Sequence, residues 1–276
     1  MDIRTRGTTI HVRERGSGEP ALVFLHYWGG SSRTWDAVAG ELSSAHRSIA
    51  VDHRGWGNSA APEQGYTIAD LANDANDVIE ALKLSRYVLV GHSMGGKVAQ
   101  LLASRRPEGL QGVVLVAPSP PSPMVLPDEQ RAAMAAAYDS RESIEWVLDN
   151  VLSANPLAPA LRGQVIADSL RGAPQARAAW PNAAMLEDIT HEVSSINVPV
   201  LVVAGELDQV DRVDTLRAEL LPRIAGSRLH VLAGTGHLSP LEAPSALAAI
   251  IRQFVGELGA AQRASGAGPG VPAVLA

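Results

Sequence analysis

Three residues of this chain are of types that together perform acyl transfer: Ser93, Asp208 and His237. A serine hydroxyl is a weak nucleophile at neutral pH, and it needs a nearby base, usually a histidine oriented by a buried carboxylate. Each of the three residues follows an apolar run of the kind that forms a buried strand. Because ligands and catalytic groups of open α/β sheets gather beyond the carboxyl ends of the strands, we expect the three side chains to converge there.

Ser93 is the centre of a G-x-S-x-G pattern that begins at Gly91 and ends at Gly95. The run Tyr87–Val90 before it is apolar, and a helical pattern, Lys97–Arg106, follows it. In a strand–turn–helix of this kind the turn is so sharp that its central residue is strained, and glycines avoid clashes where strand and helix meet. The pattern predicts a nucleophilic Ser93 whose hydroxyl stands clear of the sheet.

Two glycine patterns invite a nucleotide-binding interpretation, and both are incomplete. The segment from Gly91 to Lys97 fits G-x-x-x-x-G-K, but the next residue is Val98 and not the Ser or Thr that holds magnesium. The segment from Gly55 to Ala60 resembles part of a dinucleotide-binding motif, but no helical pattern begins there. We therefore expect no cofactor.

Other ionisable residues near the three candidates have simpler explanations. Asp211 and Asp214 fall where a helix is expected to begin, so we predict that they cap its N-terminus. Glu206 comes two residues before Asp208 and is expected to be exposed. His92, the variable residue of the serine motif, is expected to be structural. No H-E-x-x-H or comparable spacing is present, so no metal site is predicted.

Repeated strand–helix units must position these residues. Continuous apolar runs bounded by glycine and polar residues indicate parallel strands buried on both faces. The runs are Ala21–Leu25, Ser48–Val51, Tyr87–Val90, Gly112–Ala117, Val198–Ala204 and Arg228–Leu232. The helical patterns between or after them are Arg33–Ser44, Ile68–Leu82, Lys97–Arg106, Asp211–Ile224 and Leu241–Leu258. Alternating segments at 2–6 and 9–15 add an antiparallel edge hairpin. The sequence predicts an α/β fold with a mostly parallel, doubly wound sheet.

One connection is too long for an ordinary loop. A strand-to-helix loop usually has about two to six residues, whereas the segment between Ala117 and Val198 is long and contains no strand pattern. Its helical patterns are Asp128–Tyr138, Arg141–Leu152, Leu157–Leu170 and Gln175–Ile189. We interpret residues 119–194 as an inserted helical cap, residues 1–118 and 195–258 as the core, and residues 259–276 as a disordered tail.

Composition excludes several classes of function. The net charge is −6 and no basic cluster is present, which argues against a nucleic-acid partner. The chain has no cysteine, so thiol nucleophiles and thiolate metal sites are excluded. The N-terminus is polar, and no apolar run approaches the ~18 residues of a membrane helix. We expect a cytoplasmic protein whose partner is a small molecule and not a membrane.

Several segments together resemble the α/β-hydrolase superfamily, and in particular its small, capped esterase- and perhydrolase-like members. These are the serine motif, the loops that carry Asp208 and His237, and the segments His26–Ser31 and Asp52–Ser59. The resemblance covers residues 8–258. It implies an α/β-hydrolase fold with an inserted helical cap, in which nucleophile, acid and histidine follow in that order along the chain.

The resemblance also implies an oxyanion hole built from two backbone N–H groups. The first belongs to Met94, directly after the nucleophile. The second comes from the loop 26–31, which in relatives usually has the sequence H-G-aromatic. That match assigns the donor to Trp28, with Tyr27 in place of the glycine. The side chains predicted to bind substrate are Tyr27, Trp28, Trp146 and Trp180, and Met124, Met134, Tyr138 and Met185 are further candidates in the cap.

A serine at the nucleophile position argues against the family's haloalkane dehalogenases and epoxide hydrolases, which use a carboxylate there. The resemblance implies a carboxylesterase that cleaves small to medium esters through an acyl-enzyme on Ser93. Perhydrolase, lactonase and carbon–carbon bond hydrolase are alternatives with the same triad. An acyltransferase, or a small-molecule receptor with slow turnover, is an alternative of another class. These alternatives differ in pocket shape and in the access of water.

Overall fold

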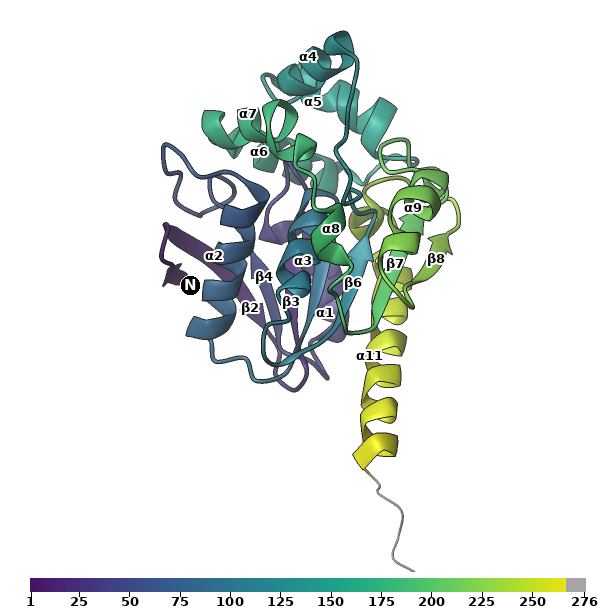
Figure 1. The fold of residues 1–276 in the computed structure, drawn as a ribbon. Helices are drawn as coiled ribbons and strands as arrows, with labels where there is room; N and C mark the ends of the chain where they lie inside the picture. The colour runs from purple at the N-terminus through teal and green to yellow at the C-terminus, as the bar shows by residue number, and fades with distance from the viewer. Residues whose placement is uncertain (267–276) are drawn as a thin grey trace, which may run out of the picture.

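The computed structural model describes residues 1–266 and is built around one eight-stranded sheet (Figure 1). The strands are β1 (Asp2–Arg4), β2 (Thr9–Arg15), β3 (Ala21–Leu25), β4 (Ser48–Val51), β5 (Tyr87–His92), β6 (Leu110–Val116), β7 (Val200–Gly205) and β8 (Arg228–Leu232). They lie in the order β1-β2-β4-β3-β5-β6-β7-β8. The first two strands are antiparallel to their neighbours, and the rest are parallel to one another. The predicted fold class is confirmed.

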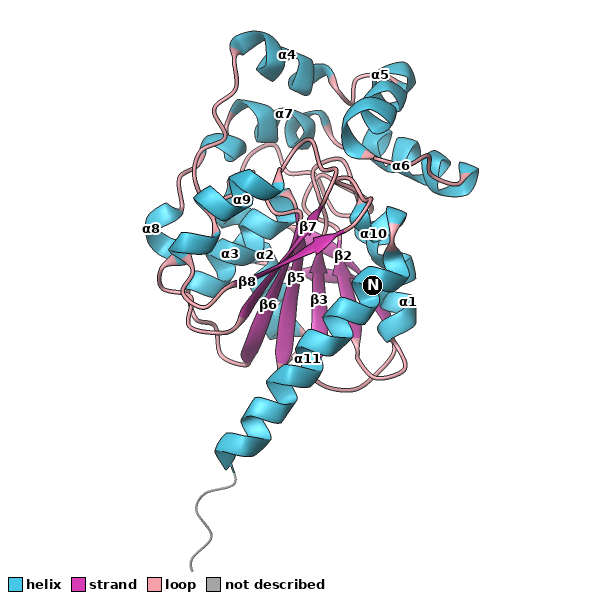
Figure 2. Ribbon diagram, turned by 90° about the vertical axis from the view of Figure 1, so that its right-hand side faces the viewer, coloured by secondary structure: helices cyan, strands magenta, loops and turns pink. Residues whose placement is uncertain are grey.

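Helices cover both faces of the sheet (Figure 2). One layer is α1 (Asp36–Leu42) and α11 (Pro244–Gly266), and the other is α2 (Ile68–Ala81), α3 (Met94–Ser104), α8 (Thr190–Val193) and α9 (Val213–Glu219). Strand β5 shows why both layers are needed. Val88 and Val90 pack into the first layer, whereas Tyr87 and Leu89 pack into the second, because successive side chains of a strand point to opposite faces.

The segment between β6 and β7 is helical. It contains α4 (Asp128–Ala136), α5 (Arg141–Val147) with a π-helical turn at Leu148–Leu152, α6 (Pro159–Arg171), α7 (Pro174–Asn182) and the short α8. Figure 1 shows α4 to α7 above the carboxyl ends of the strands, whereas α8 lies lower, beside α3. The cover over the sheet edge therefore consists of α4 to α7. No helix among residues 1–266 is both long enough and apolar enough to span a bilayer.

Three sequence predictions about the elements were wrong in detail. The strand predicted at Arg228–Leu232 exists as β8, but it lies at the sheet edge, where only β7 pairs with it and most of its side chains are exposed. The helix predicted from Lys97 begins three residues earlier, at Met94, because α3 follows the sharp turn at Ser93 directly. Helix α11 continues to Gly266, so residues 259–266 are not a disordered tail. Alanine, glutamine and arginine favour helix there. The rest of the predicted tail lies outside the described residues.

Candidate active site

Ser93 lies between β5 and α3 in a strained conformation, with φ 53° and ψ −116°. Glycine is required on both sides of it. A Cβ atom on Gly91 would lie 2.4 Å from the carbonyl oxygen of Gly95, and one on Gly95 would lie 2.5 Å from that of Leu25. The Ser93 N–H donates to Val116 O at 3.0 Å, which ties the turn to β6. The hydroxyl is thereby held at the N-terminus of α3, where negative charge is favoured.

Asp208 and His237 come together from the loops after β7 and β8. His237 Nδ1–H donates to Asp208 Oδ2 at 2.9 Å, and both side chains are buried. The other carboxylate oxygen, Oδ1, accepts the backbone N–H groups of Val210 at 2.8 Å and Asp211 at 3.1 Å. Three donors therefore hold the Asp208 carboxylate, and the carboxylate fixes the orientation of the imidazole.

The charges of this pair follow from its surroundings. Burial opposes ionisation of Asp208, but the charge and hydrogen bond of His237 and the two backbone donors lower the pKa of the carboxyl below its usual value. Burial also opposes protonation of His237, but Asp208 outweighs it and raises the pKa of the imidazole above its usual value. At neutral pH Asp208 is a carboxylate. When His237 is neutral, its one proton is on Nδ1, and Nε2 is left as the acceptor.

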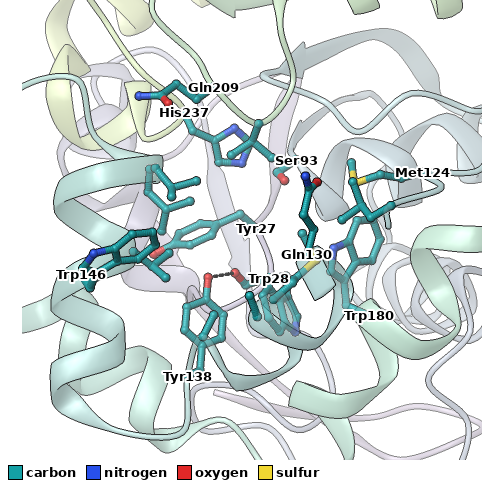
Figure 3. A pocket seen from close by; sticks show the side chains of 18 residues that line it. Tyr27, Trp28, Ser93, Met124, Gln130, Tyr138, Trp146, Trp180, Gln209 and His237 are labelled. Atoms are coloured by element: carbon teal, nitrogen blue, oxygen red, sulfur yellow. Dashed lines mark hydrogen bonds between the residues drawn. The ribbon is translucent and has the colours of Figure 1, made fainter. Parts of the chain in front are cut away.

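Ser93 and His237 line the same pocket (Figure 3). No hydrogen bond joins Ser93 Oγ to the imidazole among the described contacts, and such bonds commonly tighten only when substrate is bound. The loop that carries His237 is held from behind by His92, whose Nε2–H donates to the carbonyl oxygen of His237 at 2.8 Å. Burial lowers the pKa of His92 well below its usual value, so this ring is neutral. His92 therefore has the structural role that the sequence suggested.

The loop after β3 is oriented by His26. The Nε2 atom of His26 accepts the His53 N–H at 3.0 Å, so the proton of the neutral ring is on Nδ1, which donates to Tyr27 O at 2.7 Å. The Gly30 N–H donates to the same oxygen at 3.0 Å. The C=O and N–H of a trans peptide point in opposite directions. The Tyr27–Trp28 peptide therefore directs the Trp28 N–H away from these two donors.

Both predicted oxyanion donors are unpaired. Within residues 1–266, neither the Trp28 N–H nor the Met94 N–H has a backbone acceptor. Met94 is the first residue of α3, and the first N–H groups of a helix have no partner inside it. A hydroxyl, an imidazole, a carboxylate and two free N–H groups are the components of acyl transfer through a tetrahedral intermediate.

The pocket into which Ser93 and His237 open has a volume of about 340 Å³ and lies beneath the cap (Figure 3). Aromatic and aliphatic side chains form most of its wall. The aromatic residues are Tyr27, Trp28, Tyr138, Trp146 and Trp180, and the other lining residues are Met124, Leu126, Gln130, Ala133, Met134, Ala137, Val147, Val151, Leu152, Gln209 and Val210. No Asp, Glu, Lys or Arg is among the described residues of the lining. The pocket therefore suits an uncharged, mostly apolar ligand.

Comparison with known proteins decides the family. The model of the "Alpha/beta hydrolase family" matches residues 22–250. The chain belongs to the alpha/beta hydrolase family. This hydrolase is 31% identical over 207 residues to a 2-(acetamidomethylene)succinate hydrolase of Mesorhizobium japonicum, covering 72% of this chain and 74% of that protein. It is 29% identical over 250 residues to a non-heme chloroperoxidase of Kitasatospora aureofaciens, covering 84% and 89% of the two chains.

Among solved structures, the hydrolase is similar to an esterase, EaEST, from Exiguobacterium antarcticum. The TM-score is 0.85 at 26% sequence identity, and the match covers 92% of this chain and 98% of the esterase. The relatives thus support hydrolase chemistry for the chain, and they carry out more than one reaction on the same fold.

Most of the residues predicted to bind substrate line the pocket. Tyr27, Trp28, Trp146 and Trp180 all line the pocket, and so do three of the four further candidates. Met185 does not, because it is fully buried in the core, so that prediction was wrong. Sequence analysis missed two polar lining residues, Gln130 and Gln209. Their signal was weak, although Gln209 directly follows the candidate acid.

The predicted role of Asp211 was also wrong. Helix α9 begins at Val213 after Arg212, with no side-chain cap. Asp211 is instead 1% exposed, and neither carboxyl oxygen has a hydrogen-bond partner within the described structure. Burial, against the charge of His237, raises the pKa of Asp211 well above its usual value. Burial therefore favours the protonated, uncharged form of this carboxyl.

Asp214 and Glu206 lie at the surface of the same region of the hydrolase. Asp214 is in the first turn of α9, where it pairs with Arg217 at 3.3 Å and does not cap the helix. Glu206 is exposed, as predicted, and accepts the Gly234 N–H at 2.8 Å. Among residues 1–266 no cluster of His, Cys, Asp and Glu is arranged to hold a metal ion. That the site works without a metal or cofactor stays a prediction.

Proposed function

We propose that this hydrolase is a serine carboxylesterase that cleaves small to medium uncharged esters through an acyl-enzyme on Ser93. The observation that carries the proposal is the hydrogen bond between Asp208 and His237 at the wall of the pocket into which Ser93 opens. That bond leaves the free nitrogen of His237 as a proton acceptor beside the candidate nucleophile. The strained turn at Ser93 and the similarity to a solved esterase support the same conclusion.

In the proposed reaction, Ser93 Oγ attacks the carbonyl carbon of the ester while His237 Nε2 takes the hydroxyl proton. The carbonyl oxygen becomes an oxyanion, which accepts hydrogen bonds from the N–H groups of Trp28 and Met94. The intermediate collapses, the bond to the alcohol oxygen breaks, and His237 returns the proton to the leaving alcohol. Water then attacks the acyl-enzyme with His237 again as base. Asp208 stays ionised and orients the imidazole throughout.

The lining of the pocket supports an uncharged substrate. A carboxylate buried beside Trp180 or Trp28 would meet no Lys or Arg among the described lining residues, and burying an unpaired charge is costly. The relative from Mesorhizobium japonicum is named for a succinate substrate. We expect this hydrolase to reject such a substrate. Its partners are then neutral esters, with no part for a nucleic acid or a membrane.

The similarity to a non-heme chloroperoxidase favours one second candidate, perhydrolysis. In that reaction hydrogen peroxide replaces water in the attack on the acyl-enzyme, and the product is a peroxy acid in place of the acid. The first half of the reaction is unchanged. Lactonase, carbon–carbon bond hydrolase, acyltransferase and slow-turnover receptor share the triad and are separated from the esterase by the experiment below.

The test is steady-state hydrolysis of p-nitrophenyl esters from acetate to decanoate, with Ser93→Ala and Ser119→Ala side by side. Ser119 is a matched control because it is buried close to Ser93, to whose carbonyl oxygen its N–H donates at 3.1 Å, and lies outside the pocket lining. Sustained turnover that only Ser93→Ala abolishes supports the esterase. One equivalent of p-nitrophenol followed by a stall indicates a receptor, and turnover that survives Ser93→Ala contradicts the proposal.

Added hydrogen peroxide, alcohols and lactones then separate the variants of the chemistry. A peroxy acid formed faster than the carboxylic acid would move the function to perhydrolysis. Acceleration by an added alcohol, with an ester as product, would indicate an acyltransferase.

A further inference from the structure

The cap binds the loop that carries the Trp28 N–H. Tyr138, which follows α4, donates its hydroxyl to the carbonyl oxygen of Trp28 at 2.8 Å, as the dashed line in Figure 3 shows. Ser169 of α6 donates its hydroxyl to the carbonyl oxygen of Gly29 at 2.9 Å. Both side chains are buried. Two consecutive carbonyl groups of the loop therefore accept hydrogen bonds from two different parts of the cap, the turn after α4 and helix α6.

Further contacts extend this attachment along the loop. The buried carboxylate of Asp168, also on α6, accepts the Ser31 hydroxyl at 2.9 Å and the Arg33 Nε–H at 3.1 Å. The Trp28 indole N–H donates to the carbonyl oxygen of Arg177 in α7 at 3.2 Å. Residues 28 to 33 are thus attached to the cap at several successive positions.

The loop needs this support because its own backbone is free to rotate. It contains Gly29, with φ +98°, followed by Gly30. A Cβ atom on Gly29 would lie 2.4 Å from the ring of Tyr138, so the cap packs directly on the backbone there. The core holds the Tyr27 carbonyl through His26, and it holds the Ser32 N–H through the carboxylate of Asp52 at 2.6 Å. The opposite side of Trp28, its own carbonyl, is held only by the cap within the described structure.

We propose that Tyr138 and Ser169 are positioning residues that hold the Trp28 N–H in place as an oxyanion donor, so that the oxyanion hole is complete only when the cap is docked. The inference rests on the proposed function. It makes the cap a part of the reaction geometry and not only a wall of the pocket, because lifting α6 and Tyr138 breaks the bonds that fix the loop.

The direct test compares Tyr138→Phe, Ser169→Ala and the double variant with Arg171→Ala. Tyr138→Phe removes only the hydroxyl and keeps the ring that packs on Trp28, 4.3 Å between centroids. Arg171 is the matched control because it also joins the cap to the core, through Asn58 Oδ1 at 2.7 Å, but does not contact the loop. Loss of a whole oxyanion donor costs about 10²–10³-fold in kcat. We expect Tyr138→Phe and Ser169→Ala each to lose ~10-fold in kcat, and the double variant to lose more. The loss in each single variant is smaller than for a missing donor, because the Trp28 N–H is displaced and not removed.

Two readouts separate positioning from mere packing. The KM for the p-nitrophenyl ester should stay within about twofold, because the donors act on the transition state and not on the bound ester. The affinity for an alkyl trifluoromethyl ketone, which forms a tetrahedral adduct with the serine, should fall in parallel with kcat. Arg171→Ala should match the wild type in both. An unchanged kcat, or a rise in KM that accounts for the whole loss of kcat/KM, would overturn the inference.

Amide hydrogen exchange of residues 26–31 in the unliganded protein tests the loop without any substrate. We expect faster exchange in Ser169→Ala and Tyr138→Phe than in Arg171→Ala at equal global stability, and equal exchange would overturn the inference. If the wild type shows no Ser93-dependent turnover, the proposed function fails. The exchange result still decides in that case whether the cap fixes the loop.

Discussion

Helices α3 and α4 are of similar length and are packed in opposite ways. Every residue of α3 from Met94 to Ala103 is buried, between β5, β6 and α2, whereas α4 has no buried residue. The first helix begins beside the candidate nucleophile, and the second belongs to the outer part of the cap (Figure 1). The difference teaches that the candidate nucleophile stands at the start of a fully enclosed helix, whereas the outer cap helix that helps to line the pocket is held by little packing.

The largest loss of activity is expected from Ser93→Ala, at the start of the enclosed helix α3. Removal of the nucleophile should lower kcat by about 10⁶-fold, because no other hydroxyl can replace Ser93 at the strained turn. Hydrolysis of the best p-nitrophenyl ester, with the circular dichroism spectrum as a check on folding, measures this. Residual activity above about 1% of wild type would show that the nucleophile lies elsewhere.

Asp208→Asn should lower kcat by about 10⁴-fold, because the amide favours the wrong tautomer of His237. The pH dependence of kcat/KM gives an independent test of the pairing of Asp208 with His237. In the wild type kcat/KM should rise with pH through a pKa above that of an ordinary histidine, since His237 must be neutral to act as base and Asp208 raises its pKa. Without the carboxylate, burial is the largest remaining influence and lowers that pKa, so the acid limb should move to lower pH. A limb that stays in place would count against the pairing.

The packing of α3 and α4 can also be compared through the free energy of unfolding, with one substitution in each helix. Leu102→Ala in α3 should lower the free energy of unfolding by about 2–5 kcal/mol, since the side chain is fully enclosed. Ala132→Gly in α4 should lower it by about 1 kcal/mol through helix propensity alone. Urea unfolding of both variants measures the difference. Equal losses would mean that the cap is as tightly packed as the core.

Trp146→Ala tests the cap as a specificity surface. The side chain lines the pocket from α5 and is 60% exposed, so its loss enlarges the pocket without disturbing a packed core. We expect KM for the longer esters to change by about 2–10-fold with kcat nearly unchanged. Leu186→Ala is the control, because Leu186 is an exposed cap residue outside the lining. A large fall in kcat would assign Trp146 to the reaction geometry.

The smallest effect is expected from Asp211→Asn. Burial favours the uncharged form of this acid and neither of its oxygens is hydrogen-bonded within the described structure, so an amide of the same shape should change kcat/KM by less than about threefold. The comparison with Asp208→Asn, three positions away, is the sharpest available on this loop. If the two variants exchanged their effects, the assignment of the acid would have to be exchanged as well.

Prediction from sequence worked where the chain's local pattern determines the structure. The buried runs Ala21–Leu25 and Ser48–Val51 form strands with those bounds, because short apolar runs between turn residues favour buried strands over helices. The meeting of Asp208 and His237 followed from their places after two strands that proved to be neighbours. The local sequence and the order of the strands along the chain were enough to make these two predictions.

Prediction failed where burial depends on distant segments. The isolated carboxyl of Asp211 resembles a helix cap in sequence, and only the packing around it in three dimensions shows that it is enclosed. The bond from Tyr138 to Trp28 joins residues 110 positions apart, and that from Ser169 to Gly29 joins residues 140 apart. No periodicity marks such pairs, because a tyrosine or serine in a cap helix has many equivalent surroundings.

Helix α11 ends at Gly266, on the side of the molecule opposite the cap (Figure 1). Its last turns extend past the sheet, away from the mouth of the pocket. A linker joined to a solid support through this end of the chain would therefore orient every molecule with its pocket toward the solution. Immobilised in that way, the protein would keep the same access to dissolved compounds as the free form.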